Sequence, residues 1–176
     1  MSVRHESDRP FAAVCDEEPI YAEAVGKLLE TQLPEIERVA CATSTARLLE
    51  AASASCFRLV ITDLDMPPSD VVETIRQLVE ANPDTSVVIL TRRDSDRDVA
   101  GALAAGARGY ILKDATCAEF VASIRAVLAG NLVVPFDLLL PVMRALEPTV
   151  EGDNWSRPSE GPALLTAASG TAPAGR

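Results

Sequence analysis

Short apolar runs alternate with longer amphipathic segments over residues 10–130 of the chain. Short apolar or β-branched runs between turn-forming residues are typical of buried strands, whereas apolar residues that recur every three or four positions are typical of helices. The pattern predicts strands at Phe11–Cys15, Ile36–Cys41, Phe57–Thr62, Ser86–Thr91 and Arg108–Leu112.

An amphipathic helix is predicted after each of these strands, and local residues mark where the helices begin. Pro19 suits the first turn of the first helix, and Ser69 is the expected N-cap of the third. Thr116 and Glu119 have the spacing of a capping box, which satisfies free amides at a helix start. The predicted helices run from Pro19 to Thr31, from Thr43 to Ala54, from Ser69 to Ala81, from Ser95 to Ala105 and from Thr116 to Ala129.

Five successive strand–helix units predict an α/β fold with a parallel sheet covered by helices on both faces. The flavodoxin-like doubly wound order 2-1-3-4-5 fits five strands. Residues 1–9 are expected to form a polar arm, residues 10–130 the domain, and residues 131–146 a linker helix. Residues 147–176 are rich in Pro, Gly, Ser, Thr and Ala, a composition typical of disordered tails.

Composition and charge exclude several classes of protein. A net charge of −10 argues against a surface for nucleic acids, whose phosphates need a basic face. The single histidine, His5, excludes a histidine-based catalytic site or zinc cluster. No leader-like or membrane-spanning apolar run is visible, so a cytoplasmic location is expected. The cysteines, expected to be small buried residues in a reducing compartment, are Cys15, Cys41, Cys56 and Cys117.

Polar residues follow or close four of the predicted strands. Asp16-Glu17 follows the first strand, Asp63 the third and Lys113 the fifth, and Thr91 ends the fourth. The carboxyl ends of parallel strands meet at one edge of a sheet, where α/β folds bind ligands. Carboxylate oxygens suit Mg²⁺, and a hydroxyl and an ammonium suit a phosphoryl group. The positions therefore predict phosphoryl transfer onto Asp63.

Three strings of sequence resemble a known family. AVCDEEPIYAEAVGKLLE resembles the first strand, acidic pair and first helix of a bacterial response-regulator receiver domain. LVITDLDMPPSD resembles its phosphoacceptor segment, and VVILTRRDSDRDVAGALAAGARGYILKDA resembles its fourth strand, fourth helix and G-Y-x-x-K-D motif. The resemblance covers about residues 10–130 and is closest to the NarL/FixJ-like subfamily.

The resemblance implies a phosphorylation site with a metal beside it. Asp63 would accept a phosphoryl group from a sensor histidine kinase. Asp16, Glu17, Asp63 and the backbone carbonyl of Asp65 would hold Mg²⁺, which offsets the repulsion between a carboxylate and a phosphate. The chain would then be a signalling domain and not an enzyme, apart from its own phosphorylation and dephosphorylation.

The resemblance also implies a conformational switch. Lys113 would pair with the phosphoryl oxygens, and Thr91 would donate its hydroxyl to them. Tyr110 matches the family's switch aromatic, which moves inward when the threonine is drawn toward phosphate.

Some residues depart from the family's pattern. Glu17 is one methylene longer than the usual aspartate, Pro68-Ser69 stiffens the loop after the acceptor, and Asp65 adds a carboxylate beside it. Arg92, a long cation after Thr91, could cover the site or neutralise phosphate. These departures leave open an atypical receiver controlled by a ligand or partner without phosphorylation. A flavin-binding enzyme was a third candidate, but the acidic CDEEP loop would repel a flavin phosphate.

The segment after the domain bears on partners. NarL/FixJ-like regulators usually continue into a helix-turn-helix domain, and no pattern of that length follows Leu146. We therefore expect no direct nucleic acid binding by this chain, and any transcriptional effect would pass through another protein. The apolar stretch Pro135–Leu146, without an obvious burial partner, favours a homodimer, or a heterodimer with another regulator, through the receiver's helices.

Overall fold

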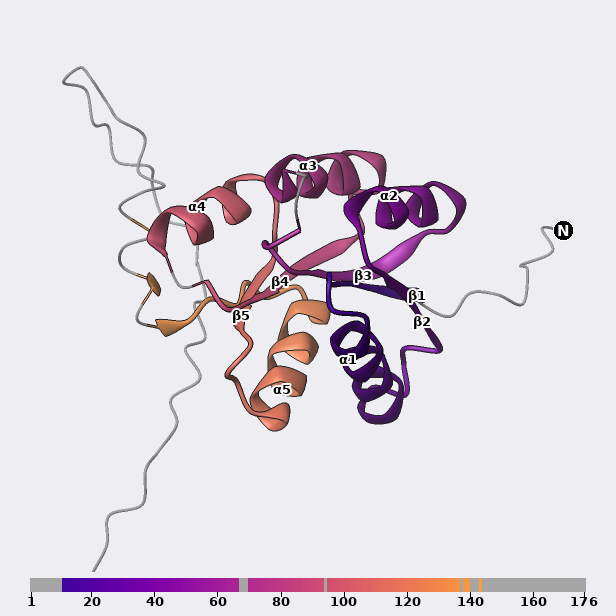
Figure 1. The fold of residues 1–176 in the computed structure, drawn as a ribbon. Helices are drawn as coiled ribbons and strands as arrows, with labels where there is room; N and C mark the ends of the chain where they lie inside the picture. Colours follow the sequence, from indigo (N-terminus) through magenta and orange to yellow (C-terminus); the bar gives the residue numbers. More distant parts are fainter. Residues whose placement is uncertain (1–10, 67–69, 94, 137, 140–142, 144–176) are drawn as a thin grey trace, which may run out of the picture.

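The structure is a computed structural model that describes residues 11–66, 70–93, 95–136, 138, 139 and 143. Five strands alternate with five helices in its main body (Figure 1). The strands are β1 (Phe11–Cys15), β2 (Arg38–Ala42), β3 (Phe57–Thr62), β4 (Ser86–Thr91) and β5 (Gly109–Leu112). The helices are α1 (Pro19–Gln32), α2 (Thr45–Ala54), α3 (Val71–Ala81), α4 (Asp96–Ala104) and α5 (Cys117–Leu128).

The strands form one parallel sheet in the order β2-β1-β3-β4-β5, which confirms the predicted doubly wound fold. Helices α1 and α5 cover one face of the sheet, and α2, α3 and α4 cover the other (Figure 1). Side chains alternate between the faces of a strand, so neighbouring residues of one strand enter different cores. In β3, Val60 belongs to the core under α2–α4, and Ile61 belongs to the core under α1 and α5.

Helix starts follow the expected chemistry, with one correction. The Thr116–Glu119 capping box is present, and the Ser95 side chain accepts from the Asp98 amide. The third helix is capped by Asp70 and not by Ser69, because the Asp70 carboxylate accepts from the amides two and three residues later. A carboxylate at this position also faces the positive end of the helix dipole.

Two glycines follow helix ends where the backbone turns into the left-handed region. Gly106, after α4, has φ +109°, and Gly130, after α5, has φ +91°. Other residues adopt such angles with strain, which explains why glycine stands at both positions.

The cysteines differ from the sequence expectation. Cys15 is buried at the end of β1, but Cys41, Cys56 and Cys117 are exposed. Position near an apolar run therefore did not determine burial: Cys41 lies on the outer strand β2, and Cys56 precedes β3. Within the described residues, no helix has the length and apolar character needed to cross a membrane.

Residues 131–136, here called the strap, run beside β5 after α5 ends. Val133 forms a parallel bridge with Gly109, accepting from the Tyr110 amide at 2.8 Å. Leu138 follows the strap and is buried in the core under α2–α4, whereas Phe136 is 82% exposed. One residue of the apolar stretch that begins at Pro135 is thus buried against the core, which the sequence did not reveal. Residues 144–176, which include the predicted tail, lie outside the described residues.

Candidate functional site: the carboxyl edge of the sheet

The register of the sheet brings the polar residues predicted from the sequence to one edge. Cys15 pairs with Thr62 across β1 and β3, so Asp16 and Asp63 leave adjacent strands at the same level. Thr91 pairs with Leu112 across β4 and β5, which places Lys113 one residue beyond Thr91. The edge therefore gathers residues that are up to 97 positions apart in the chain.

Lys113 links the two buried carboxylates of this edge. Its Nζ donates to Asp16 Oδ2 and to Asp63 Oδ2, both at 2.6 Å. The side chains of all three residues are 4–5% exposed. An ammonium and two carboxylates that are shielded from water interact more strongly than they would on the surface, and the geometry of such a group is correspondingly well defined.

The second oxygen of each carboxylate binds the backbone of its own loop. Asp16 Oδ1 accepts from the Glu18 amide at 2.9 Å, and Asp63 Oδ1 accepts from the Asp65 amide at 3.2 Å. Both aspartates therefore hold a loop with one oxygen and Lys113 with the other. This shared arrangement fixes the orientation of the two carboxylates before any ligand binds.

Hydrogen bonding sets the charge state of the site. Burial alone would raise the pKa of Asp63, but hydrogen bonds from Lys113, Thr91 and the Asp65 amide outweigh it and lower that pKa below its ordinary value. Burial alone would lower the pKa of Lys113, but its bonds to Asp16 and Asp63 raise it. Both shifts favour an ionised Asp63 and a charged Lys113 at neutral pH.

Thr91 and Tyr110 lie beside this group and share a contact. Thr91 is fully buried, and its Oγ1 accepts from the Arg93 amide at 3.4 Å. Tyr110 is 1% exposed, and its hydroxyl donates to the Arg93 carbonyl at 2.8 Å. The predicted phosphoryl ligand and the predicted switch aromatic therefore meet the same backbone segment, at residues 91–93.

Two exposed arginines bridge the loops at this edge. Arg92 Nη2 lies 2.8 Å from Glu18 Oε1, which links the end of β4 to the start of α1. Arg93 pairs with Asp65 at 3.2 Å and with Asp98 at 2.8 Å. Arg92 and Asp65 were predicted from the sequence, whereas Glu18 and Arg93 were not. The run of acids at 16–18 and the adjacent arginines at 92–93 could have signalled pairing between these two loops.

Tyr21 was also missed by the sequence analysis. It lies in the first turn of α1, and the centre of its ring is 4.3 Å from Lys113 Nζ. A cation at this distance from an aromatic face is attracted by the ring's electrons. An aromatic residue one turn after an acidic loop is a weak signal, because such a residue more often belongs to a core.

The residues present suit a hard cation in part. Asp16 and Asp63 converge on one point and offer the oxygen atoms that Mg²⁺ prefers. Glu17, the third predicted carboxylate, is exposed, and no group of three acidic, histidine or cysteine residues in the described chain is arranged to hold a metal ion. The donor set thus fits Mg²⁺ through two carboxylates, with the Asp65 carbonyl and Glu17 remaining predictions.

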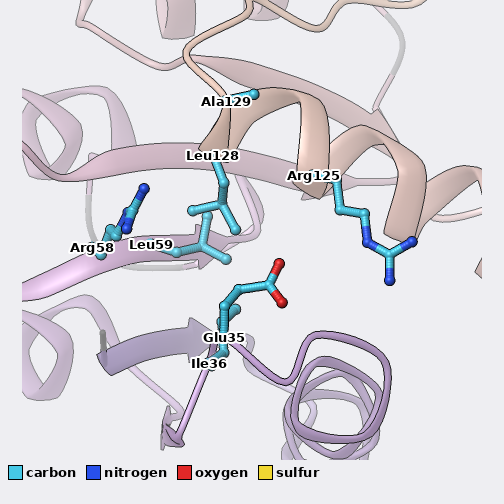
Figure 2. A pocket seen from close by; sticks show the side chains of 7 residues that line it. All are labelled: Glu35, Ile36, Arg58, Leu59, Arg125, Leu128 and Ala129. Atoms are coloured by element: carbon cyan, nitrogen blue, oxygen red, sulfur yellow. The ribbon is translucent and has the colours of Figure 1, made fainter. Parts of the chain in front are cut away.

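Cavities occur at both edges of the sheet. A cavity of about 280 Å³, lined by Arg92, Leu112, Lys113 and Asp114, opens beside the site. A larger one of about 370 Å³ lies at the opposite edge, where the parallel strands begin (Figure 2). The larger cavity holds none of the predicted site residues, so size alone does not identify the chemistry; its lining residues are Glu35, Ile36, Arg58, Leu59, Arg125, Leu128 and Ala129.

The sequence of the chain is similar to those of known proteins. Residues 12–125 match the response regulator receiver domain family. The chain is 30% identical over 160 residues to the nitrate/nitrite response regulator protein NarL of Escherichia coli (strain K12), covering 88% of this chain and 73% of NarL. It is 30% identical over 125 residues to the transcriptional regulatory protein LnrK of Bacillus subtilis (strain 168), covering 71% of this chain and 56% of LnrK.

A solved structure has a similar fold. The crystal structure of a two-component response regulator of the LuxR family from Aurantimonas sp. SI85-9A1 superposes with a TM-score of 0.69 at 25% identity. That match covers 77% of this chain and 96% of the other. The chain spans about half to three quarters of the length of the curated relatives named above. The family match extends over more than half of the chain and includes Asp16, Asp63, Thr91 and Lys113, so this chain belongs to the response regulator receiver domains of two-component systems.

Proposed function

We propose that Asp63 accepts a phosphoryl group from the phosphohistidine of a sensor histidine kinase and that the modified domain signals through altered protein contacts. The observation that carries the proposal is the buried pairing of Lys113 with both Asp63 and Asp16. Asp63 is ionised and oriented, which a nucleophile requires, and a cation stands beside it to meet incoming phosphoryl oxygens.

The chemical step is an in-line displacement at phosphorus. An oxygen of the Asp63 carboxylate forms the new O–P bond while the P–N bond of the donor breaks, and the leaving imidazole keeps that electron pair and takes a proton. Lys113 Nζ already donates to Asp63 Oδ2 and can donate to the transferred oxygens, offsetting their charge. Dephosphorylation reverses the modification: water attacks phosphorus, the Asp63 O–P bond breaks, and inorganic phosphate leaves.

Mg²⁺ would supply further charge neutralisation at this edge when bound. Asp16 and Asp63 would be its carboxylate ligands, joined by the Asp65 backbone carbonyl, with Glu17 reaching through water because of its extra methylene. Lys113 bonds to both aspartates in the present arrangement, so a divalent cation at the same oxygens competes with the ammonium.

The signal would leave the site through the backbone at Arg93. Thr91 and Tyr110 both hydrogen-bond to that residue, so drawing the Thr91 hydroxyl toward a phosphoryl group changes a segment that Tyr110 also holds. Tyr110 in turn donates its amide to Val133 of the strap. A local change in charge can thus bias the start of α4 and the segment after α5.

The readers of this signal are proposed to be proteins. A second copy of this chain or another regulator could dock on the receiver's helices, and the relative LnrK is named as a transcriptional regulatory protein. A chain with a net charge of −10 is repelled by duplex DNA, so direct binding is not expected. A titration with random and promoter DNA at low salt checks this, and tight sequence-dependent binding would contradict it.

The test of the phosphorylation site uses the intact mass of the protein after incubation with acetyl phosphate. With Mg²⁺, the wild type should gain one phosphoryl group, whereas Asp63→Asn should gain none. Asp65→Asn is the matched control, because it removes an exposed carboxylate two residues away and leaves the contacts of Lys113 in place. A gain that persists in Asp63→Asn would overturn the assignment. A wild type without any gain, from acetyl phosphate or a kinase, would favour the phosphorylation-independent receiver.

A further inference from the structure

Lys113 has a third partner besides the two carboxylates, the ring of Tyr21. The ring centre lies 4.3 Å from Nζ, within the range of a cation–π contact. The Lys113 side chain is 4% exposed, so the ammonium has little water to replace a lost partner. Cation–π contacts are stronger for ammonium groups that are shielded from water in this way.

The three partners of the ammonium differ in how they respond to phosphorylation. The charge of Asp63 changes when a phosphoryl group is attached to it, and the oxygens of Asp16 are shared with any cation that binds there. The aromatic face of Tyr21 does not take part in either event. It is therefore the one identified partner of Lys113 Nζ whose chemistry is the same before and after transfer.

We infer that Tyr21 is a positioning residue that holds the Lys113 ammonium beside Asp63 during phosphoryl transfer. The inference rests on the proposed role of Asp63 and adds a residue to it. Tyr21 is fixed in turn by the start of α1, where its amide donates to the Glu18 carbonyl at 3.0 Å. The helix start therefore sets the position of the ring, and the ring limits where Nζ can lie.

Two substitutions distinguish an effect of the aromatic ring on Lys113 from an effect of apolar packing alone. Tyr21→Phe keeps the ring and removes the hydroxyl, whereas Tyr21→Leu keeps an apolar side chain and removes the ring. The inference predicts that Phe preserves the behaviour of Lys113 and that Leu does not. Ile20→Ala is a control on the same turn of α1, because Ile20 is 84% exposed. Urea unfolding of each variant establishes that it is folded.

The first measurement is NMR of protein labelled with ¹³C at the lysine ε carbon. The chain contains two lysines, Lys27 and Lys113, so two signals are expected. Lys27 is exposed and paired with Glu30, and it serves as an internal reference. A ring current should move the Lys113 ε protons upfield in the wild type and Tyr21→Phe, and this displacement should vanish in Tyr21→Leu.

The second measurement is the initial rate of phosphorylation by acetyl phosphate with Mg²⁺. The usual strength of a cation–π contact corresponds to a fall of about 3- to 30-fold in Tyr21→Leu. Tyr21→Phe and Ile20→Ala should stay within about twofold of the wild type, since neither changes the aromatic face.

The two proposals can fail separately. A Lys113 signal that is the same in the wild type and Tyr21→Leu would overturn the inference, whatever the phosphorylation result. An unchanged rate in a folded Tyr21→Leu would also overturn it. Absence of phosphorylation in the wild type and every variant would instead overturn the proposed role of Asp63, because the NMR result does not depend on transfer.

Discussion

Three charged residues at the carboxyl edge of the sheet are buried and paired with one another, whereas the charged residues at the amino edge, around the cavity in Figure 2, are exposed. At the carboxyl edge, Lys113 is enclosed between Asp16 and Asp63. Because these charges are shielded from water, the stability of each depends on its partners. A change in the charge of one member would therefore affect the other two.

The amino edge carries the same types of charged side chain, but the stability of their charges does not depend on buried partners. Arg125 donates to the backbone carbonyl of Gln32 at 2.9 Å, and Glu35 has no ion-pair partner within the described residues. Arg58, Arg125 and Glu35 are all exposed, so water can solvate each of them. The two edges of this sheet therefore differ in the burial of their charged residues and not in the presence of acids and bases.

The two edges should differ most in the reactivity of two cysteine thiols. Burial raises the pKa of the Cys15 thiol, beside Asp16, from 9.0 to about 12. Its thiolate fraction at pH 8 is thus lower by a factor of about 10³, the difference of three pKa units. Cys56, next to the amino end of β3, is exposed. A thiol reagent should modify Cys56 in the folded protein and reach Cys15 only after unfolding, as peptide mass mapping can determine.

Removal of the central cation should destabilise one edge much more than the other. Lys113→Met leaves two carboxylates buried without their cation and should lower the free energy of unfolding by about 3 kcal/mol. Arg58→Met removes an exposed cation and should change it by about 0.5 kcal/mol or less. Urea unfolding without divalent ions measures both, and added Mg²⁺ should restore part of the loss in Lys113→Met. Equal effects of the two substitutions would refute the comparison.

Lowering the pH should also test the buried charges of the carboxyl edge, through a smaller change in the free energy of unfolding. The pKa of Asp63 is lowered in the folded state, so its contribution to stability is present above its ordinary value of 3.8 and is lost as pH falls through the folded value. The difference in stability between the wild type and Asp63→Asn should therefore change between pH 5 and the acid limit of the fold. Parallel curves for the two proteins would contradict the shift.

The smallest effect is expected at the exposed rim of the carboxyl edge. Arg92 and Glu18 are 67% and 50% exposed at their side chains, so water and salt screen their interaction. Arg92→Ala should leave the free energy of unfolding almost unchanged, and any change should shrink with added salt. A loss comparable to that of Lys113→Met would show that the buried group extends outward to this pair.

Much of the fold was predictable because local signals and tertiary packing agree. The bounds of β3 and β4 were predicted as observed, since both are continuous apolar runs between turn residues. The bounds of β2 were less accurate, because an outer strand needs apolar residues less: it runs from Arg38 to Ala42, two residues later than expected at its start. The cap at Asp70 was misplaced by one residue, because serine and aspartate are both good caps.

The residues of the site could be predicted where the end of a strand fixes their position. They could not be predicted where the contact depends on the conformation of a long side chain. Asp16, Asp63 and Lys113 were found because parallel strands bring their ends together. Arg93 and Tyr21 were not, because their contacts depend on rotamers of side chains from separate loops and helices. A sequence pattern identifies the edge on which a residue lies, but not the atom toward which a flexible side chain turns.

The strap limits how strands of separate molecules can pair along the outer edge of β5. β5 is the last strand of the sheet, and an unpaired outer strand can recruit a strand from another molecule. Val133 occupies part of that side by bonding to the Tyr110 amide and the Arg108 carbonyl. A protein cut at residue 125, where the family match ends, would lose this cover and would also uncover the surface on which Leu138 packs. The strap therefore covers part of the edge along which strands of separate molecules could otherwise pair.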